Sequence, residues 1–238
     1  NERATSTQLG GLTLPELKAF LDRGSPVDRD AKVAADAWQL ANEKKWEAVT
    51  SLATAEAPRM KRGEMRARVI LAGMWGANER KDERALKTLE PLAAHAALED
   101  AILRDHRFQI YQQLMVAADA RGDKATVRQW GDRWLHEIDL TTPKDDDERS
   151  ALDIARRDAA DLMNDPQRVI PALAASERAM PSNYNASLRL AEMYLDARMY
   201  RDAVAAADRG LARTPGPKAR GWLLRVRGDA LKAMDRVQ

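Results

Sequence analysis

Cysteine is absent from the 238 residues of this chain. Disulfide bonds, thiolate catalysis and zinc sites built on cysteine are therefore excluded within it. The absence does not identify a compartment, because an exported protein need not contain disulfides.

Long apolar stretches and an excess of one charge are also missing. No run approaches the roughly 20 apolar residues that a membrane-spanning helix needs. The 39 Lys and Arg residues nearly balance the 37 Asp and Glu residues, which leaves a net charge of +2. Aromatic residues are only 5% of the chain, so basic side chains are not interleaved with stacking groups. We therefore expect neither a membrane span nor a nucleic-acid partner.

Alanine supplies much of the apolar content, often in runs such as Ala205-Ala206-Ala207. It is the best helix former, and its small side chain lets helices approach one another closely. Val, Ile and Thr, which favour strands, are sparse and scattered. The composition predicts an all-α fold.

Apolar residues recur with helical spacing in a series of segments that pair into hairpins. Between residues 99 and 121, for example, Phe108, Tyr111 and Leu114 share one face. A hairpin cannot bury its apolar stripe alone, so we expect five stacked hairpins and a final capping helix in a superhelix. The expected helices span residues 30–44 and 46–57, 63–77 and 82–96, 99–121 and 124–138, 147–163 and 166–179, two in 184–217, and 218–235.

Prolines and polar residues predict where several of these helices begin and end. Pro58 should stop the second helix, Pro91 should kink the fourth, and Gly122-Asp123 should form a turn. Asp165 should cap the N-terminus of helix 166–179, with Pro166 at its first position.

The longest polar gap, residues 139–147, predicts a hinge between three N-terminal hairpins and two C-terminal ones. Its last three residues begin the acidic run Asp145, Asp146, Asp147 and Glu148. Calcium is one interpretation of this acidic run, but the spacing and central glycine of an EF-hand are missing. Acidic residues in a first helical turn are favoured by the helix dipole, so we expect N-capping.

Residues 184–217 are the clearest hairpin unit. Pro215 closes it and lies 34 residues after Pro181, which closes the unit before. Small residues stand where the two helices would touch: Ala191, Ala203, Ala207 and Gly210. The unit resembles the tetratricopeptide (TPR) repeat, a 34-residue helix–turn–helix with small residues at the helix contact and a closing proline. The resemblance is strong over residues 166–217 and implies a stack of hairpins that binds other proteins.

In a TPR stack, the first helix of each repeat lines the binding groove. The resemblance implies four partner-binding residues in the clear unit: Asn185, Leu188, Glu192 and Leu195. The Lys/Asn pattern with which some TPR grooves hold a C-terminal carboxylate is absent here, and Glu192 would repel one. A protein or peptide partner with exposed apolar or basic segments fits better.

Trp130 and Trp134 lie four residues apart on one face of segment 124–138. One interpretation is packing between repeats. The other is an aromatic wall of a peptide groove, because exposed Trp often anchors interfaces.

Basic residues are concentrated in two places. They are Arg59, Lys61, Arg62, Arg66 and Arg68, and, near the C-terminus, Lys218, Arg220, Arg225, Arg227, Lys232 and Arg236. A solvated helix face and a docking surface for an acidic partner both remain as interpretations.

Residues 1–24 have a different pattern. Residues 5–9 favour a short strand, and a glycine pair follows. Thr13 and Glu16 form a capping box at the start of a helix that Gly24 should end. This stretch resembles the last strand and C-terminal helix of a thioredoxin domain. The chain would then divide into a thioredoxin-like remnant, 1–24, and a TPR-like domain, 25–238.

The thioredoxin resemblance implies a thioredoxin–TPR fusion. Bacterial proteins of that layout include chaperone-like proteins that hold unfolded clients. The Cys-x-x-Cys motif of such a protein would lie upstream of Asn1, which looks like a cut or processed end because it lacks an initiator Met. The compartment stays open between the bacterial cytoplasm and the periplasm, and we favour the cytoplasm.

Histidines, phosphate loops and nucleophile motifs give no enzyme prediction. His95, His106 and His136 are not spaced as metal ligands, and no Gly-rich phosphate loop or Gly-x-Ser-x-Gly motif is present. We expect no catalytic residue, no metal and no cofactor in this chain. The predicted function is a protein-interaction scaffold that binds clients; the alternatives are a dedicated adaptor or assembly factor for one partner, and an accessory domain of a thiol-disulfide oxidoreductase.

Overall fold

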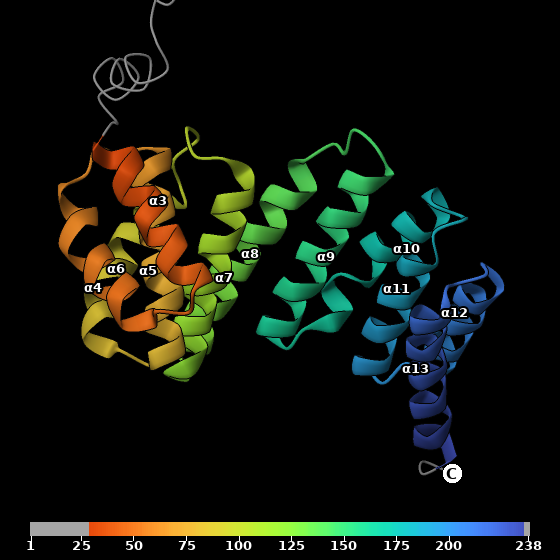
Figure 1. The fold of residues 1–238 in the computed structure, drawn as a ribbon. Coiled ribbons are helices and arrows are strands. Elements are labelled where there is room, and N and C mark those ends of the chain that lie inside the picture. Colours follow the sequence, from red (N-terminus) through yellow and green to blue (C-terminus); the bar gives the residue numbers. More distant parts are fainter. Residues whose placement is uncertain (1–28, 236–238) are drawn as a thin grey trace, which may run out of the picture. The chain divides into compact units, whose positions relative to one another are not determined.

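The computed structural model describes residues 29–235, and within this range it contains eleven α-helices, two short 3₁₀ helices and no strand (Figure 1). Contacts divide the chain into unit 1, which ends at Arg107, and unit 2, which begins at Phe108. The predicted all-α fold of helical hairpins is confirmed. The strand and helix predicted in residues 1–24 lie outside the described residues.

Unit 1 contains two helical hairpins. The first consists of α3 (Arg29–Asn42) and α4 (Trp46–Glu56), and the second of α5 (Glu64–Arg80) and α6 (Glu83–Ala96). As predicted, Pro58 ends the second helix, because α4 gives way to the 3₁₀ turn η1 (Ala57–Arg59). Helix α5 packs on α3, α4 and α6, so it is buried on several faces.

Unit 2 contains the remaining helices. They are α7 (Arg104–Ala120), which crosses the unit boundary, α8 (Lys124–Leu140), α9 (Asp146–Met163), η2 (Pro166–Arg168), α10 (Ile170–Ala179), α11 (Tyr184–Asp196), α12 (Tyr200–Ala212) and α13 (Pro217–Asp235). Helix α11 contacts α9, α10, α12 and α13, which makes it the central helix of the C-terminal part (Figure 1).

The turn inside every hairpin has the same backbone geometry. Within residues 29–235, each first helix is followed by a residue with φ between 53° and 72°, and the next residue donates its N–H to a carbonyl five positions back. This is the Schellman arrangement, which satisfies carbonyls that a helix end leaves without partners. The positive-φ residues are Lys44, Lys81, Gly122, Asn164 and Arg198, one for each of the five hairpins. The repeat is therefore a property of the backbone, although the side chains at this position differ.

Helix 166–179 is not continuous, and this prediction was wrong. Asp165 makes no side-chain capping bond, and Pro166 begins only the short η2 turn. The α-helix starts at Ile170, because Pro171 has no N–H with which a helix from residue 166 could continue. Similarly, α7 begins at Arg104 rather than at residue 99.

Residues between α8 and α9 cap the second of these helices, as predicted. Asp145 Oδ1 accepts the N–H of Glu148 at 2.8 Å, while Glu148 Oε2 accepts the N–H of Lys144 at 2.8 Å. The two acidic groups thus satisfy backbone donors on both sides of the helix start. The proposed hinge at 139–147 stays a prediction. The boundary between the two units, between Arg107 and Phe108, is a separate feature.

Small residues allow the helices of a hairpin to touch. Ala191, Ala203 and Ala207 are fully buried, at the positions where the sequence predicts helix contact. A Cβ on Gly210 of α12 would lie 2.6 Å from Leu223 of α13 and 3.1 Å from Ser187 of α11. The contact of α12 with both neighbours therefore requires glycine here.

Candidate partner-binding cleft

The first helices of the last hairpins form a cleft in unit 2. Helix α11 packs beside α9 and beside α13, and α13 follows the fifth hairpin in the place of a further first helix. The cleft has a volume of about 270 Å³. Its lining residues are Arg157 and Asp161 from α9, Glu192, Met193, Leu195 and Asp196 from α11, and Arg225 and Val226 from α13.

Charged side chains of all three helices meet at Glu192. Arg157 Nη1 of α9 lies 3.7 Å from Glu192 Oε2, and Arg225 Nη2 of α13 lies 3.9 Å from Glu192 Oε1. Both distances exceed that of a good charge-assisted hydrogen bond, which is about 2.7–2.9 Å. Glu192 is thus attracted by two cations without being tightly bound to either.

The cleft carboxylates are poorly compensated. Burial raises the pKa of Glu192 despite Arg157 and Arg225, and it raises the pKa of Asp196 despite Arg225. Burial is likewise the main reason that the pKa of Asp161 is raised, and the carboxylates of Asp196 and Asp158 add to it. Three carboxylates against two arginines leave the lining with an excess of negative charge. An added cation would stabilise their ionised forms.

Behind the cleft, α9 and α11 are joined by buried polar groups. Asp153 is 1% exposed and accepts hydrogen bonds from Ser176 Oγ at 2.9 Å and from Arg156 Nη1 at 3.1 Å. Arg189 is 7% exposed and donates to Ser150 Oγ at 2.7 Å. Burial raises the pKa of Asp153 and lowers that of Arg189. This layer fixes the spacing of the helices that carry the cleft residues.

The structure brings together two of the four groove residues expected from the TPR resemblance. Glu192 and Leu195 line the cleft, and Leu195 is partly exposed there. Leu188 is 6% exposed and belongs to the core. Asn185 lies at the start of α11, ten residues before Leu195, or about 15 Å along a helix.

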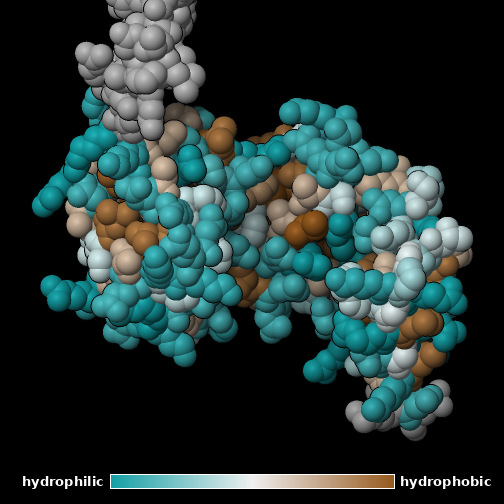
Figure 2. All heavy atoms as spheres, in the orientation of Figure 1, coloured by the Kyte–Doolittle hydropathy of each residue, from teal (hydrophilic) through white to brown (hydrophobic). Residues whose placement is uncertain are grey.

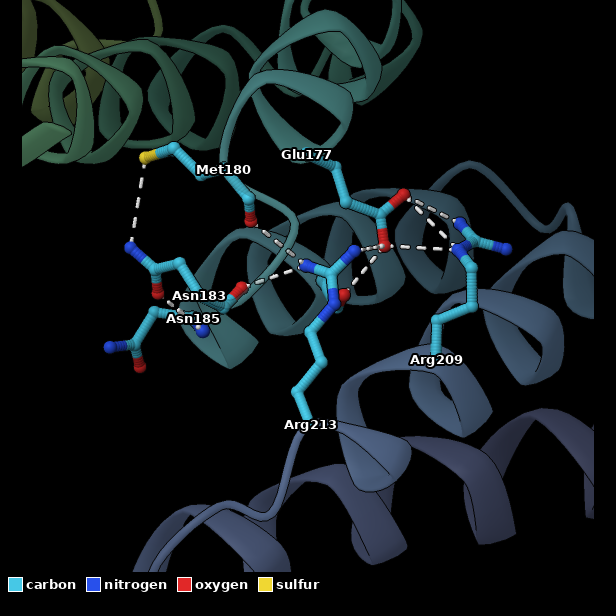
Figure 3. A network of polar contacts seen from close by, with 7 residues as sticks. Glu177, Met180, Asn183, Asn185, Arg209 and Arg213 are labelled. Carbon is cyan, nitrogen blue, oxygen red and sulfur yellow. Dashed lines mark hydrogen bonds and ion pairs between the residues drawn. The ribbon is translucent and has the colours of Figure 1, made fainter.

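Asn185 belongs instead to a network around Glu177 (Figure 3). Its backbone N–H donates to the Asn183 side chain at 2.9 Å, and Arg213 Nη1 donates to the carbonyl of Asn183, also at 2.9 Å. Glu177 accepts hydrogen bonds from both Nε and Nη2 of Arg209 and from Ser187 Oγ. The network joins α10, α11 and α12 around the turn that starts the fifth hairpin.

The two tryptophans on α8 pack against α7. The ring centroids of Trp130 and Tyr111 lie 5.9 Å apart, and those of Trp134 and Phe108 lie 6.1 Å apart. Trp130 is 9% exposed and Trp134 is 3% exposed. Their position corresponds to packing within the third hairpin and leaves little surface for a ligand.

A second cleft, of about 180 Å³, lies among α8, α9 and the start of α10, and His136 lines it. Its charges are paired inside the chain, because Arg168 lies 2.6 Å from Asp132 and Arg156 lies 3.1 Å from Asp139. His106 contacts Glu64 and lies edge-on to Trp38 inside unit 1. Within residues 29–235, no group of three or more His, Cys, Asp or Glu residues is placed to hold a metal ion.

Comparisons with known proteins add no relative. No protein-family model matches the chain, and searches of curated proteins and of solved structures also find no match. Over the described part of the chain, the helices are too short or too polar for any of them to cross a membrane.

Four charged residues of the cleft were not predicted as cleft residues: Arg157, Asp161, Asp196 and Arg225, the last of which was expected only as part of the basic C-terminal segment. Asp161 could have been predicted from the sequence, because it lies 34 residues before Leu195 and so takes the same place in the preceding repeat. The other three depend on which helix faces meet, and a single weakly repeating sequence does not specify this.

Proposed function

We propose that this chain is a protein-interaction scaffold of the TPR type that holds a partner segment in the cleft of α9, α11 and α13. The segment would carry a Lys or Arg side chain beside apolar residues. The chain would act by binding rather than by catalysis.

The observation that supports this proposal is that the negative charge of the Glu192 carboxylate is only weakly compensated by the arginines beside it. Its carboxylate lies 3.7 Å or more from each neighbouring arginine, and burial raises its pKa. A cationic side chain would supply the missing compensation in a partly desolvated place, where a charge pair is stronger than in open water. Leu195 beside it offers apolar surface for the neighbouring residue of the partner.

The test uses labelled peptides of alternating leucine and lysine, with a leucine–glutamate peptide for comparison. We expect the lysine peptide to bind more tightly, and Glu192→Gln to weaken it roughly tenfold, as loss of one charge pair can do. Glu47→Gln, on the exposed surface of α4, is the matched control and should change nothing. Equal binding of both peptides, or no effect of Glu192→Gln, would refute the proposal.

The pH dependence of binding gives an independent check. A bound cation favours ionised carboxylates, so peptide affinity should rise as the pH increases through the raised pKa values of Asp161, Glu192 and Asp196. The Glu192→Gln variant should show a shallower rise. A flat profile in the unaltered chain would mean that these carboxylates do not contact the peptide.

Clients and a single dedicated partner are distinguished by a second experiment. A chaperone-like scaffold, as the thioredoxin–TPR resemblance of residues 1–24 implies, should suppress aggregation of several unrelated unfolded proteins. A dedicated adaptor should suppress none of them and should retain one partner after affinity capture from its own cell. We favour the client-binding function, because the cleft is small and presents general features, a small excess of negative charge beside apolar side chains.

A further inference from the structure

Helix α13 buries one face and exposes another. The buried stripe consists of Ala219, Leu223, Val226 and Ala230, which pack towards α11 and α12. A different stripe is exposed to solvent and consists of Gly221, Leu224, Gly228 and Leu231. Figure 2 shows apolar surface, in brown, among hydrophilic atoms at this end of unit 2.

The exposed stripe has the spacing of a helix-packing surface. Its residues are separated by three, four and three positions, as in the seam between two packed helices. Leu224 is 47% exposed and Leu231 is 37% exposed. A Cβ on Gly221 or Gly228 would meet no atom within 4 Å. The stripe therefore offers two apolar knobs and two open holes.

Unit 1 contains an example of such a surface when it is covered. Helix α5 packs on α3 and α4 as α13 packs on α11 and α12. Helix α5 is in addition covered by α6, the second helix of its own hairpin. Helix α13 has no such cover within residues 29–235.

The residues around the stripe determine what could cover it. Helix α13 carries five basic residues, Lys218, Arg220, Arg225, Arg227 and Lys232, against Asp229 and Asp235. Arg227 is paired with Asp208 at 2.7 Å, and Arg225 lies 3.9 Å from both Glu192 and Asp229. Arg220 and Lys232 are exposed on opposite sides of the stripe, and neither has a carboxylate within 4 Å among the described residues.

A second copy of the chain fits the shape of the stripe and not its charge. Two antiparallel α13 helices could set Leu224 against Gly228 and Leu231 against Gly221. The two-fold axis would bring each flank of the stripe against the same flank of the second copy, so Arg227 would lie beside the second Arg227 and Arg225 beside the second Arg225. Like charges held this close cost binding energy, and specific interfaces avoid them.

We infer that the Gly221–Leu231 stripe of α13 is a docking surface for an amphipathic helix of another protein, with apolar residues in its seam and acidic residues on both flanks. The acidic flanks would pair with Arg220 on one side and Lys232 on the other. This surface is separate from the cleft, and it does not depend on the function proposed for the cleft.

The test uses two 18-residue synthetic helical peptides with the same Leu/Ala seam, one flanked by glutamates and one by lysines. In the Glu192→Gln chain, whose cleft has lost its attraction for lysine, the glutamate peptide should bind at least about tenfold more tightly than the lysine peptide in fluorescence anisotropy, and added salt should weaken that binding. Arg220→Ala should reduce the preference. Glu47→Gln, on the exposed surface of α4, should leave it unchanged.

The decisive variant is Gly228→Leu, which fills one hole. Because the added side chain meets open space and leucine favours helix more than glycine, the thermal midpoint should stay the same or rise by about 2–4 °C. Peptide affinity should nevertheless fall at least about tenfold. Asp229→Leu, on another face of the same helix, is the control and should not weaken binding.

Four results would overturn the inference. They are equal binding of the two peptides, full binding by Gly228→Leu, a concentration-dependent dimer of the unaltered chain that Gly228→Leu abolishes, and binding to phosphatidylserine vesicles that exceeds binding to the acidic peptide. The third result would identify a second copy as the occupant, and the fourth a lipid surface.

Discussion

Gly73 of α5 lies against Ala53 of α4 with no room for a side chain between them. A Cβ on Gly73 would collide with the Cβ of Ala53, whose Cα is only 3.7 Å away. Leu89 of α6 would lie 3.1 Å from the same atom. The two hairpins of unit 1 are therefore held at a spacing that a single methyl group would change.

Gly73→Ala should destabilise the protein by about 1–3 kcal/mol, although alanine favours helix, because overpacking forces the helices apart. Denaturant unfolding followed by circular dichroism measures the change. Gly221→Ala is the control, since its Cβ meets open space, and it should stabilise by up to about 1 kcal/mol. Equal effects of the two substitutions would mean that the α4–α5 contact yields readily.

Glu177→Gln should cost about 1–3 kcal/mol, since it leaves Arg209 and Arg213 beside a neutral group in a partly buried place. Burial opposes ionisation of Glu177, but hydrogen bonds from Arg209 and Ser187 outweigh it and lower its pKa below the ordinary 4.5. Its contribution is therefore present above pH 4.5 and is lost as the pH falls through the lower folded-state value. Unfolding at pH 7 and in the acid range measures both effects, and a variant that matches the unaltered chain at pH 7 would contradict them.

Glu192→Gln should have the opposite effect on stability. Burial raises the pKa of Glu192 above the ordinary 4.5, so the folded state holds the proton more tightly than the unfolded state. Its contribution to stability must then decline as the pH rises from 4.5 through the folded-state pKa. At pH 7 the variant should be as stable as the unaltered chain or up to about 0.5 kcal/mol more stable. A stabilised variant with weaker peptide binding would mark Glu192 as a residue kept for binding.

Trp134→Ala should cost about 3–5 kcal/mol, because the ring is 3% exposed and packs on Phe108. Trp130→Ala, which removes the contact with Tyr111, should also destabilise the chain. If both residues serve only packing, peptide affinity per folded molecule should not change in either variant. Loss of affinity at full folding would restore the interpretation that they line a groove.

The sequence predicts the fold class well, because alanine content and helical spacing are local properties that stacking then reinforces. Pro58 and the small residues at 191, 203 and 207 mark a helix end and helix contacts directly. Pro171 was overlooked, and its missing N–H explains why helix 166–179 is divided into η2 and α10. The sequence predicts the cleft only in part. Arg157 and Arg225 lie on α9 and α13, and the packing of these helices decides which of their faces line the cleft.

The shared hairpin turn escaped prediction for a different reason. Glycine is the residue expected at a positive φ, and among the five turn residues only Gly122 fits that expectation. Lys44, Lys81 and Arg198 occupy the equivalent positions without any local sequence cue. Five repeated Schellman turns thus coexist with side chains that hide the repeat.

Those turns give the final prediction. Lys81 and Arg198 are exposed, and they hold φ values of 54° and 59°, which cost a non-glycine residue about 1 kcal/mol or more. Lys81→Gly and Arg198→Gly should each stabilise the chain by about 0.5 kcal/mol, because relief of backbone strain outweighs the larger entropy of glycine in the unfolded chain. Gly122→Ala is the converse variant: its Cβ would meet no atom within 4 Å, so a loss of about 1 kcal/mol would reflect backbone conformation alone. Thermal unfolding measures all three. If Gly122→Ala is neutral while the two glycine variants lose stability, the positive φ is not what holds these turns, and the carbonyl contacts of the Schellman motif must carry them instead.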